Sequence, residues 1–334
     1  MALITKTVKP SGGDYTSLSA WDAAEATDLV TATNQHRCEC YKGDYTGSGG
    51  GVNYISDSLL LSSSWVTNST YNITIIVPLS ERHSGRPKDG SGNYTGFTVR
   101  NDGGWVRGIY LNSIDYTNLD GFIVDVYDNT GGSGIFAYSN GGITDNCIVI
   151  NASYSGIYAY HCGSTTHTVI NSIAIDSSIA FRCPDWGQGK IYNCGAHNCV
   201  TGFHLSGIGP ADKLKNCWAK GCTTGFSISG THTIENCASS DASLPTGNGN
   251  RNSQTFTFVD EANDYFQPNV NDSAIKGYGQ DLSAIFTDDI LGNTRTTPWD
   301  IGPFVFAKGQ PMALRNLSVP HIRTQNWAQP IGIN

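Results

Sequence analysis

The chain has 334 residues, a formal net charge of −8 and 14% charged residues, and 39 of its residues are glycine. This length allows a large buried core, and many glycines with little charge are typical of short strands joined by tight turns. The acidic balance argues against a nucleic-acid partner, because phosphate binding needs clustered Lys and Arg. No run of eighteen apolar residues occurs, so we expect no membrane span either.

The N-terminal region, residues 1–30, predicts a strand, a Gly-Gly turn and a short helix from about Ser17 to Ala26. Three residues should share one side of this helix: Leu18, Trp21 and Ala24. We expect the helix to cover the open edge of the sheets that follow. The opening residues "MALITKTVKPSGGDY" lack an apolar core and a cleavage site, so no cleavable signal peptide is expected.

The next part of the chain carries further strands with less regular spacing, which we interpret as irregular early coils. The segments are 73–77, 97–100, 106–111 and 114–126.

Residues 134–240 carry two short motifs that recur with one period. The first, seen in "DNCIV", "YNCGA", "KNCWA" and "ENCAS", recurs around five asparagines: Asn146, Asn171, Asn193, Asn216 and Asn236. The steps between them are 25, 22, 23 and 20 residues. The second motif, seen in "SGIFAY", "SGIYAY", "TGFHLS" and "TGFSIS", recurs between the asparagines. A period in the twenties made of short alternating strands and turns, without a helical stripe, predicts an all-β solenoid of the parallel β-helix type.

We expect the β-helix to span residues 31–306, with its clearest coils at 134–240. Coils of a β-helix stack about 4.8 Å apart, so equivalent residues form columns. The asparagines would then form a ladder whose amides bond from coil to coil. The next column should point inward and fill a narrow interior: Cys147, Ser172, Cys194, Cys217 and Cys237.

Cys199 and Cys222 form a further stacked pair, 23 residues apart. A vertical column does not give the tetrahedral geometry that zinc needs, and no export signal precedes the ten cysteines. We therefore interpret the cysteines as free thiols and expect no metal site and no cofactor.

The regular period ends after about residue 240. A long polar loop follows, and "FTDDILGNTRTTPWDIGPFVF" at 286–306 predicts a turn and a closing strand. Residues 307–334 contain three prolines and no periodicity, so we expect an extended C-terminal arm that lies along its own coil or docks on a neighbour.

These motifs resemble those of right-handed parallel β-helix proteins of the pectate-lyase-like kind and of phage spikes and fibres. "GGDYTSLSAW" is similar to their opening strand and cap helix, the two repeats to their coils, and "DDILGNTR" with "WDIG" to a closing motif. The resemblance implies a right-handed parallel β-helix over about residues 4–306. It implies little about function, because the fold hosts lyases, hydrolases, esterases, adhesins and phage tailspikes.

Outward positions on two adjacent coils predict an exposed aromatic patch that binds glycan or a protein neighbour. The predicted binding residues are Phe136, Tyr138, Tyr158, Tyr160, Arg182, Trp186 and His204. If the protein were an enzyme, a polysaccharide lyase or glycoside hydrolase, the candidates beside this patch would be Asp176, Arg182 and Asp185. The Gly-His-Gly signature of polygalacturonase-like hydrolases is absent, which weakens the enzyme hypothesis.

A second outward column is apolar: Ile148, Ile173 and Trp218, with Gly195 between them. We interpret it as a contact between subunits, for example in a trimer, with coverage by the protein's own loops or arm as the alternative.

The sequence therefore favours a non-catalytic structural protein of a virion or cell surface, such as a phage spike, fibre or capsid decoration protein. We expect it to self-associate, to contact other virion or surface proteins, and to bind polysaccharide. A polysaccharide lyase or hydrolase and a secreted β-helix adhesin are the alternatives.

Overall fold

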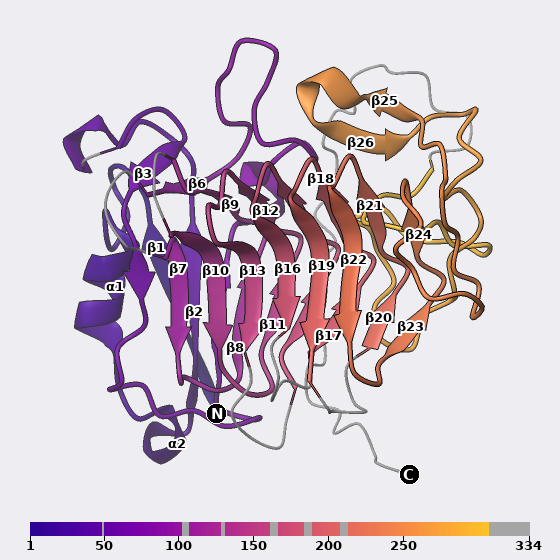
Figure 1. Ribbon diagram of the computed structural model, residues 1–334. Helices are drawn as coiled ribbons and strands as arrows, with labels where there is room; N and C mark the ends of the chain where they lie inside the picture. The colour runs from indigo at the N-terminus through magenta and orange to yellow at the C-terminus, as the bar shows by residue number, and fades with distance from the viewer. Residues whose placement is uncertain are drawn as a thin grey trace.

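The computed structural model describes residues 1–48, 50–101, 107–127, 131–160, 166–183, 189–207 and 213–306 (Figure 1). Within these ranges the chain consists mainly of strands, which form three long parallel sheets. Successive strands pass from the first sheet to the second and the third, and then return to the first one coil further on. The chain is therefore a parallel β-helix, as the repeat predicted.

Each coil contributes one strand to each sheet in its regular part. The first sheet contains β1 (Ala2–Val8), β2 (Asn34–Cys40), β5 (Ile73–Ile76), β8 (Thr117–Asp120), β11 (Ile143–Asp145), β14 (Thr168–Ile170), β17 (Lys190–Tyr192), β20 (Lys213–Lys215) and β23 (Thr233–Glu235). The second contains β3 (Tyr54–Ser56), β6 (Thr98–Arg100), β9 (Ile123–Asp125), β12 (Ile148–Ile150), β15 (Ile173–Ile175), β18 (Gly195–His197), β21 (Trp218–Lys220) and β24 (Ala238–Ser239). The third contains β4 (Leu59–Leu60), β7 (Ile109–Asn112), β10 (Ser133–Tyr138), β13 (Ser155–Tyr160), β16 (Ile179–Cys183), β19 (Thr201–Ser206) and β22 (Thr224–Ser229).

The repeated asparagine occupies the turn between the first and the second sheet. The five residues, Asn146, Asn171, Asn193, Asn216 and Asn236, have φ values between 46° and 54°. Most residues are strained in this left-handed region, but the short polar side chain of Asn tolerates it. The backbone of the turn therefore explains why asparagine recurs.

The predicted hydrogen bonds between asparagine side chains of successive coils occur in only part of the column. Nδ2 of Asn216 donates to Oδ1 of Asn193 over 3.0 Å. Nδ2 of Asn171 instead donates over 3.0 Å to the carbonyl oxygen of Asp288, far along the chain. The ladder is therefore also an anchor for the C-terminal part of the protein.

The neighbouring column points into the coil and is fully buried, as predicted; its members are Cys147, Ser172, Cys194, Cys217 and Cys237. Each side chain donates to the backbone carbonyl two residues earlier, over 3.2 Å for Cys147 and 2.8 Å for Ser172. Cys and Ser share this column because both are small and both satisfy the same carbonyl. None of the nine cysteines within the described ranges forms a disulfide with another of them.

The glycine of the second motif allows neighbouring coils to approach closely. A Cβ atom at Gly134 would lie 2.8 Å from the carbonyl oxygen of Gly156, and one at Gly202 would lie 2.5 Å from that of Gly225. Neither gap accommodates a side chain, so the "G-I/F" motif follows from packing.

The N-terminal cap contains α1 (Leu18–Glu25) and α2 (Leu29–Ala32). Ser17 caps α1 by accepting the backbone N–H of Ala20, and Leu18 and Trp21 are buried as predicted. Ala24, which was expected on the same side of the helix, is exposed. The helix instead buries Asp22, whose carboxylate accepts the indole N–H of Trp65 over 2.7 Å.

After β24 the chain leaves the coil and folds back over the second sheet. The next element is an antiparallel hairpin of β25 (Phe258–Asp260) and β26 (Tyr265–Pro268). It is drawn in orange in Figure 1 and lies near the last coils. Residues 286–306 form the predicted turn but contain no strand; isolated bridges join Asp288 to Thr294 and Gly279 to Trp299. The predicted arm, 307–334, lies outside the described residues.

The apolar outward column of the second sheet is covered by this C-terminal part of the chain. Ile148, Ile173 and Trp218 are fully buried. The indole of Trp218 lies 5.0 Å from the ring of Phe258 and 5.6 Å from that of Phe266, measured between centroids. The column is therefore not available to a second subunit. This corrects the predicted subunit contact in favour of the alternative, coverage by the protein's own chain.

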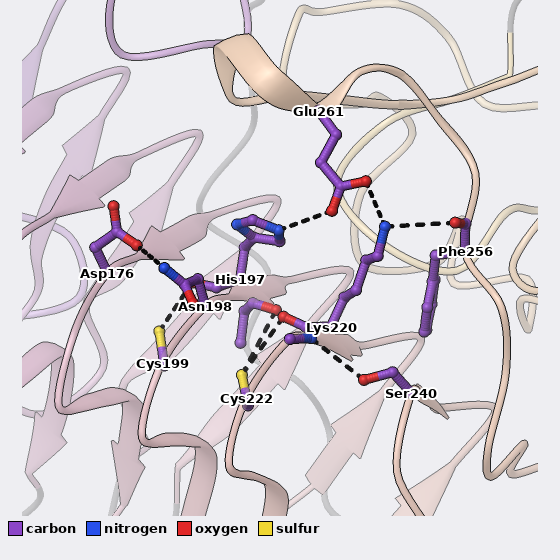
Figure 2. Close-up of polar contacts among 11 residues, drawn as sticks. Asp176, His197, Asn198, Cys199, Lys220, Cys222, Ser240, Phe256 and Glu261 are labelled. Atoms are coloured by element: carbon purple, nitrogen blue, oxygen red, sulfur yellow. Dashed lines mark hydrogen bonds and ion pairs between the residues drawn. The ribbon is translucent and has the colours of Figure 1, made fainter.

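Two polar groups hold the covering segment in place. Buried Arg295 donates to Oδ1 of Asn171 over 2.9 Å and to the carbonyl oxygen of Gly302 over 3.0 Å, and burial lowers the pKa of Arg295 to about 10. Glu261 of the short helix η3 (Glu261–Asn263) bridges two coils: it accepts from His197 over 3.0 Å and pairs with Lys220 (Figure 2). The C-terminal part of the chain is thus fixed to the coil at two separate places.

Candidate functional site

The third sheet presents a row of aromatic side chains on its outward face. Phe136 of β10 lies in register with Tyr110 of β7 and Tyr158 of β13. Tyr138 lies in register with Tyr160 one coil later. We call these five residues the aromatic strip. They share one face because successive side chains of a strand alternate sides and the strands are parallel and in register.

The rings of the aromatic strip contact one another across the coils. The ring centroids of Phe136 and Tyr158 are 4.4 Å apart, and those of Tyr138 and Tyr160 are 5.0 Å apart. Phe136 and Tyr110 meet edge to face at 5.2 Å. Aromatic pairs at such separations stabilise each other beyond their buried area, so the strip forms a preorganised surface.

An arginine lies over each end of the aromatic strip. The guanidinium of Arg107 lies 4.0 Å from the centroids of both Tyr110 and Phe136. Arg182 lies 5.2 Å from the centroid of Tyr158, and its Nη1 donates to the hydroxyl of Tyr154 over 2.5 Å. Within the described residues, no ion pair joins either arginine to a carboxylate.

The aromatic strip surrounds an open hollow of about 260 Å³. Its lining consists of the five strip residues, so no carboxylate of the described chain borders it. Tyr158 is 8% exposed, and burial raises the pKa of its phenol while Arg182 acts in the opposite direction. The hydroxyl of Tyr158 is therefore uncharged at neutral pH.

The structure brings together most of the residues predicted for glycan or partner binding. Phe136, Tyr138, Tyr158 and Tyr160 border the hollow, and Arg182 adjoins it. His204 lies next to Arg182 in the following coil but does not line the hollow. Trp186 lies outside the described residues.

Tyr110 and Arg107 extend the predicted aromatic patch by one coil, and neither residue was predicted from the sequence. The signal was present, because "RGIYLN" at 107–112 matches "SGIFAY" in its Gly-Ile-aromatic core. The irregular spacing of the early coils hid this match.

Of the residues predicted for the catalytic alternative, Asp176 and Arg182 border different surfaces. Asp176 lies in the turn before β16 and borders a separate hollow of about 570 Å³. Its carboxylate accepts Nδ2 of Asn198 over 2.5 Å (Figure 2). Arg182 is instead on the outward face of β16, beside Tyr158, and Asp185 lies outside the described residues.

The described part of the chain contains neither a cluster of metal ligands nor a membrane-spanning helix. There, no group of three or more His, Cys, Asp or Glu side chains could hold a metal ion. No helix of that part is long and apolar enough to cross a membrane.

The fold and this surface define a parallel β-helix protein with an aromatic face on one of its three sheets. The chain matches no protein-family model, and no curated protein matches it either.

Proposed function

We propose that this protein is a non-catalytic structural protein of a virion surface, such as a phage spike, fibre or decoration protein, and that the aromatic strip binds glycan. The observation that supports glycan binding is the hollow lined by Tyr110, Phe136, Tyr138, Tyr158 and Tyr160. Ring faces pack against the C–H groups of a sugar, and the phenol hydroxyls at the ring edges exchange hydrogen bonds with its hydroxyls.

The size of the hollow favours a glycan over a protein neighbour. About 260 Å³ is close to the lower end of small-ligand sites, which run from roughly 300 to 1,000 Å³. A stable protein interface instead needs about 800 Å² of surface from each partner. Arg107 and Arg182 add fixed donors at the two ends of the strip.

A virion role is supported by the cysteines. None of the nine cysteines of the described ranges forms a disulfide with another of them, and cysteines without disulfides are typical of a chain that folds in a reducing compartment. A phage structural protein folds in such a compartment before the virion is released. Secretion of a folded adhesin through an oxidising compartment would favour disulfides instead.

A glycan array tests the binding site. The double variant Tyr138→Ala, Tyr160→Ala should lose about fivefold or more in affinity, because two stacked rings contribute about 1–3 kcal/mol in sum. A matched control, Ser227→Ala with Ser229→Ala, alters outward positions of β22 in the same sheet and should bind as the wild type does. Equal binding by the wild type and the double variant would show that the strip is not the site.

Two further measurements test the structural role. Light scattering of the full chain should give the mass of a homo-oligomer, and mass spectrometry should detect the chain in purified virions. Incubation with bacterial polysaccharides should release no reducing or unsaturated ends. A monomer that depolymerises the glycan it binds would identify an enzyme instead.

A further inference from the structure

Cys199 and Cys222 face each other across two neighbouring coils. The backbone N–H of Asn198 donates to the carbonyl oxygen of Lys220, and that of Thr223 donates to the carbonyl oxygen of Cys199, each over 3.0 Å. These two bonds bracket the cysteines and fix them in register. Neighbouring strands lie about 4.8 Å apart, which is within the range of about 4.4–6.8 Å between the Cα atoms of a disulfide.

This pair differs from the other stacked thiols in its access to solvent. Cys194, Cys217 and Cys237 are fully buried, whereas Cys222 is partly exposed. Cys199 borders the hollow of about 570 Å³, together with the residues on either side of Cys222. The pair therefore lies nearer to solvent than the buried column does, with Cys199 at the edge of the hollow and Cys222 partly exposed.

The two thiols also differ from each other. The Cys199 thiol donates to the carbonyl oxygen of His197 over 3.2 Å. The interaction between the two thiols lowers the pKa of Cys222, and that interaction together with burial raises the pKa of Cys199. Cys222 makes long contacts to the carbonyl oxygens of Lys220 and Ala196, at 3.8 and 4.0 Å (Figure 2). Cys222 is thus the more accessible thiol and the more readily ionised one, as an attacking thiol must be.

We propose that Cys199 and Cys222 form a reactive dithiol site that takes a small disulfide, RSSR, and closes to a disulfide between two coils. The Cys222 thiolate attacks one sulfur of RSSR, which forms a Cys222–S–S–R bond and releases RS⁻. Cys199 loses its proton to the released thiolate and attacks the Cys222 sulfur, which expels the second RS⁻. In total, two cysteine thiols are oxidised to one disulfide and RSSR is reduced to two thiols.

The bond would cross-link the two coils that hold the covering segment. His197 and Lys220, the partners of Glu261, each lie two residues before one of the two cysteines (Figure 2). Closing the disulfide would therefore stabilise the part of the coil to which the hairpin β25–β26 is attached. This inference is independent of the proposed glycan site, which lies on the third sheet.

The test treats the native full chain with 4,4′-dithiodipyridine, a small disulfide that releases pyridinethione when a thiol attacks it. Absorbance measures the released thione, and peptide mass spectrometry identifies the products. The reference protein, called the parent, is the full chain with the single change Cys162→Ser, because Cys162 lies outside the described residues; all other variants are made in this parent. The parent should release two equivalents of thione quickly, keep no adduct, and yield a peptide linking Cys199 to Cys222. The variant Cys199→Ser should release one equivalent and keep a mixed disulfide on Cys222.

The chain supplies matched controls for this experiment. Ser177 occupies the equivalent place one coil before Cys199 and donates to the carbonyl of Ile175 over 3.0 Å, so serine is compatible with this column. Cys222→Ser should abolish the fast release, and Cys217→Ser, in the buried column, should leave it unchanged. Three outcomes would each overturn the proposal. They are a parent that does not react, fast thione release that survives Cys222→Ser, and a mixed disulfide that persists on Cys222 in the parent.

Discussion

The outward faces of the second and the third sheet both carry apolar columns, but they meet different surroundings. On the second sheet, Ile148, Ile173 and Trp218 are fully buried and belong to one apolar cluster with Phe256, Phe258 and Phe266. On the third sheet, the aromatic strip lines a hollow that is open to solvent. Similar signals in the sequence therefore lead to an internal interface in one case and to a candidate binding surface in the other.

The chemistry of the two columns explains this difference. Isoleucine has no polar side-chain atom, so exposing a column of it to water is unfavourable and covering it is stabilising. Four of the five strip residues are tyrosines, whose side chains combine an apolar ring with a polar hydroxyl, so leaving them at a surface is less unfavourable than exposing isoleucine. The asparagine ladder also lies next to the second sheet and offers amides to the covering segment, as the bond from Asn216 to the carbonyl oxygen of Gln280 shows.

The largest effect should come from removing the indole of the covered face. Trp218→Ala leaves a cavity between the second sheet and the phenylalanines above it, and we expect a loss of about 3–5 kcal/mol in the free energy of unfolding. Denaturant unfolding measures this change. A loss below about 1 kcal/mol would show that the covering segment does not pack on the coil in solution.

The asparagine ladder should give the next largest effect. Asn216 has φ of 54°, donates to the carbonyl oxygen of Gln280 over 2.8 Å and accepts its backbone N–H over 2.7 Å. Asn216→Ala should cost about 2–3 kcal/mol in the free energy of unfolding, because it adds backbone strain and loses these bonds.

Asn216→Gly separates the two causes, since glycine tolerates the left-handed turn but cannot make the bonds. We expect it to cost about half as much as alanine. Equal losses in the two variants would mean that backbone strain does not contribute.

A smaller and pH-dependent effect should come from Glu261. Burial alone would raise the pKa of this carboxyl, but the bonds from Lys220 and His197 outweigh burial and lower it. A lowered pKa means that the carboxylate stabilises the fold above about pH 4.5 and that this contribution is lost as the pH falls further. The pair is partly exposed, so we expect about 1 kcal/mol or less.

Hydrogen exchange, corrected for intrinsic rates, can follow this loss in the amides of β25 and β26. Protection there should fall as the pH drops from about 5 to about 3, while that of β10 and β13 stays constant. Asp264, whose pKa burial raises, favours the folded state as it protonates, so Glu261→Gln is needed to isolate the effect of Glu261. Unchanged pH dependence in that variant would exclude the bridge as its cause.

A similarly small effect on stability should come from the aromatic strip. The double variant Tyr138→Ala, Tyr160→Ala removes two partly exposed rings from the third sheet, and we expect a loss of no more than about 1.5 kcal/mol, the interaction energy of one such ring pair. Circular dichroism and denaturant unfolding check this. A loss as large as that of Trp218→Ala would mean that the strip serves the core rather than a ligand.

The sequence by itself determined the coil and its columns. The spacing of Asn146, Asn171 and Asn193 predicted the turns, and the interior position of Cys147 and Cys217 followed from alternation along a strand. Both signals are local: they depend on neighbours within one coil or on the same position in the next coil, and a fixed period displays them directly.

The tertiary structure decided which outward column is covered. Trp218 meets Phe258 and Phe266, which lie 40 and 48 residues further along the chain in a segment without any repeat. It also decided that Asp176 and Arg182 belong to different surfaces, although they are six residues apart in the sequence. Contacts of this kind depend on how a non-periodic segment folds back, and a pattern of apolar and polar residues does not encode that path.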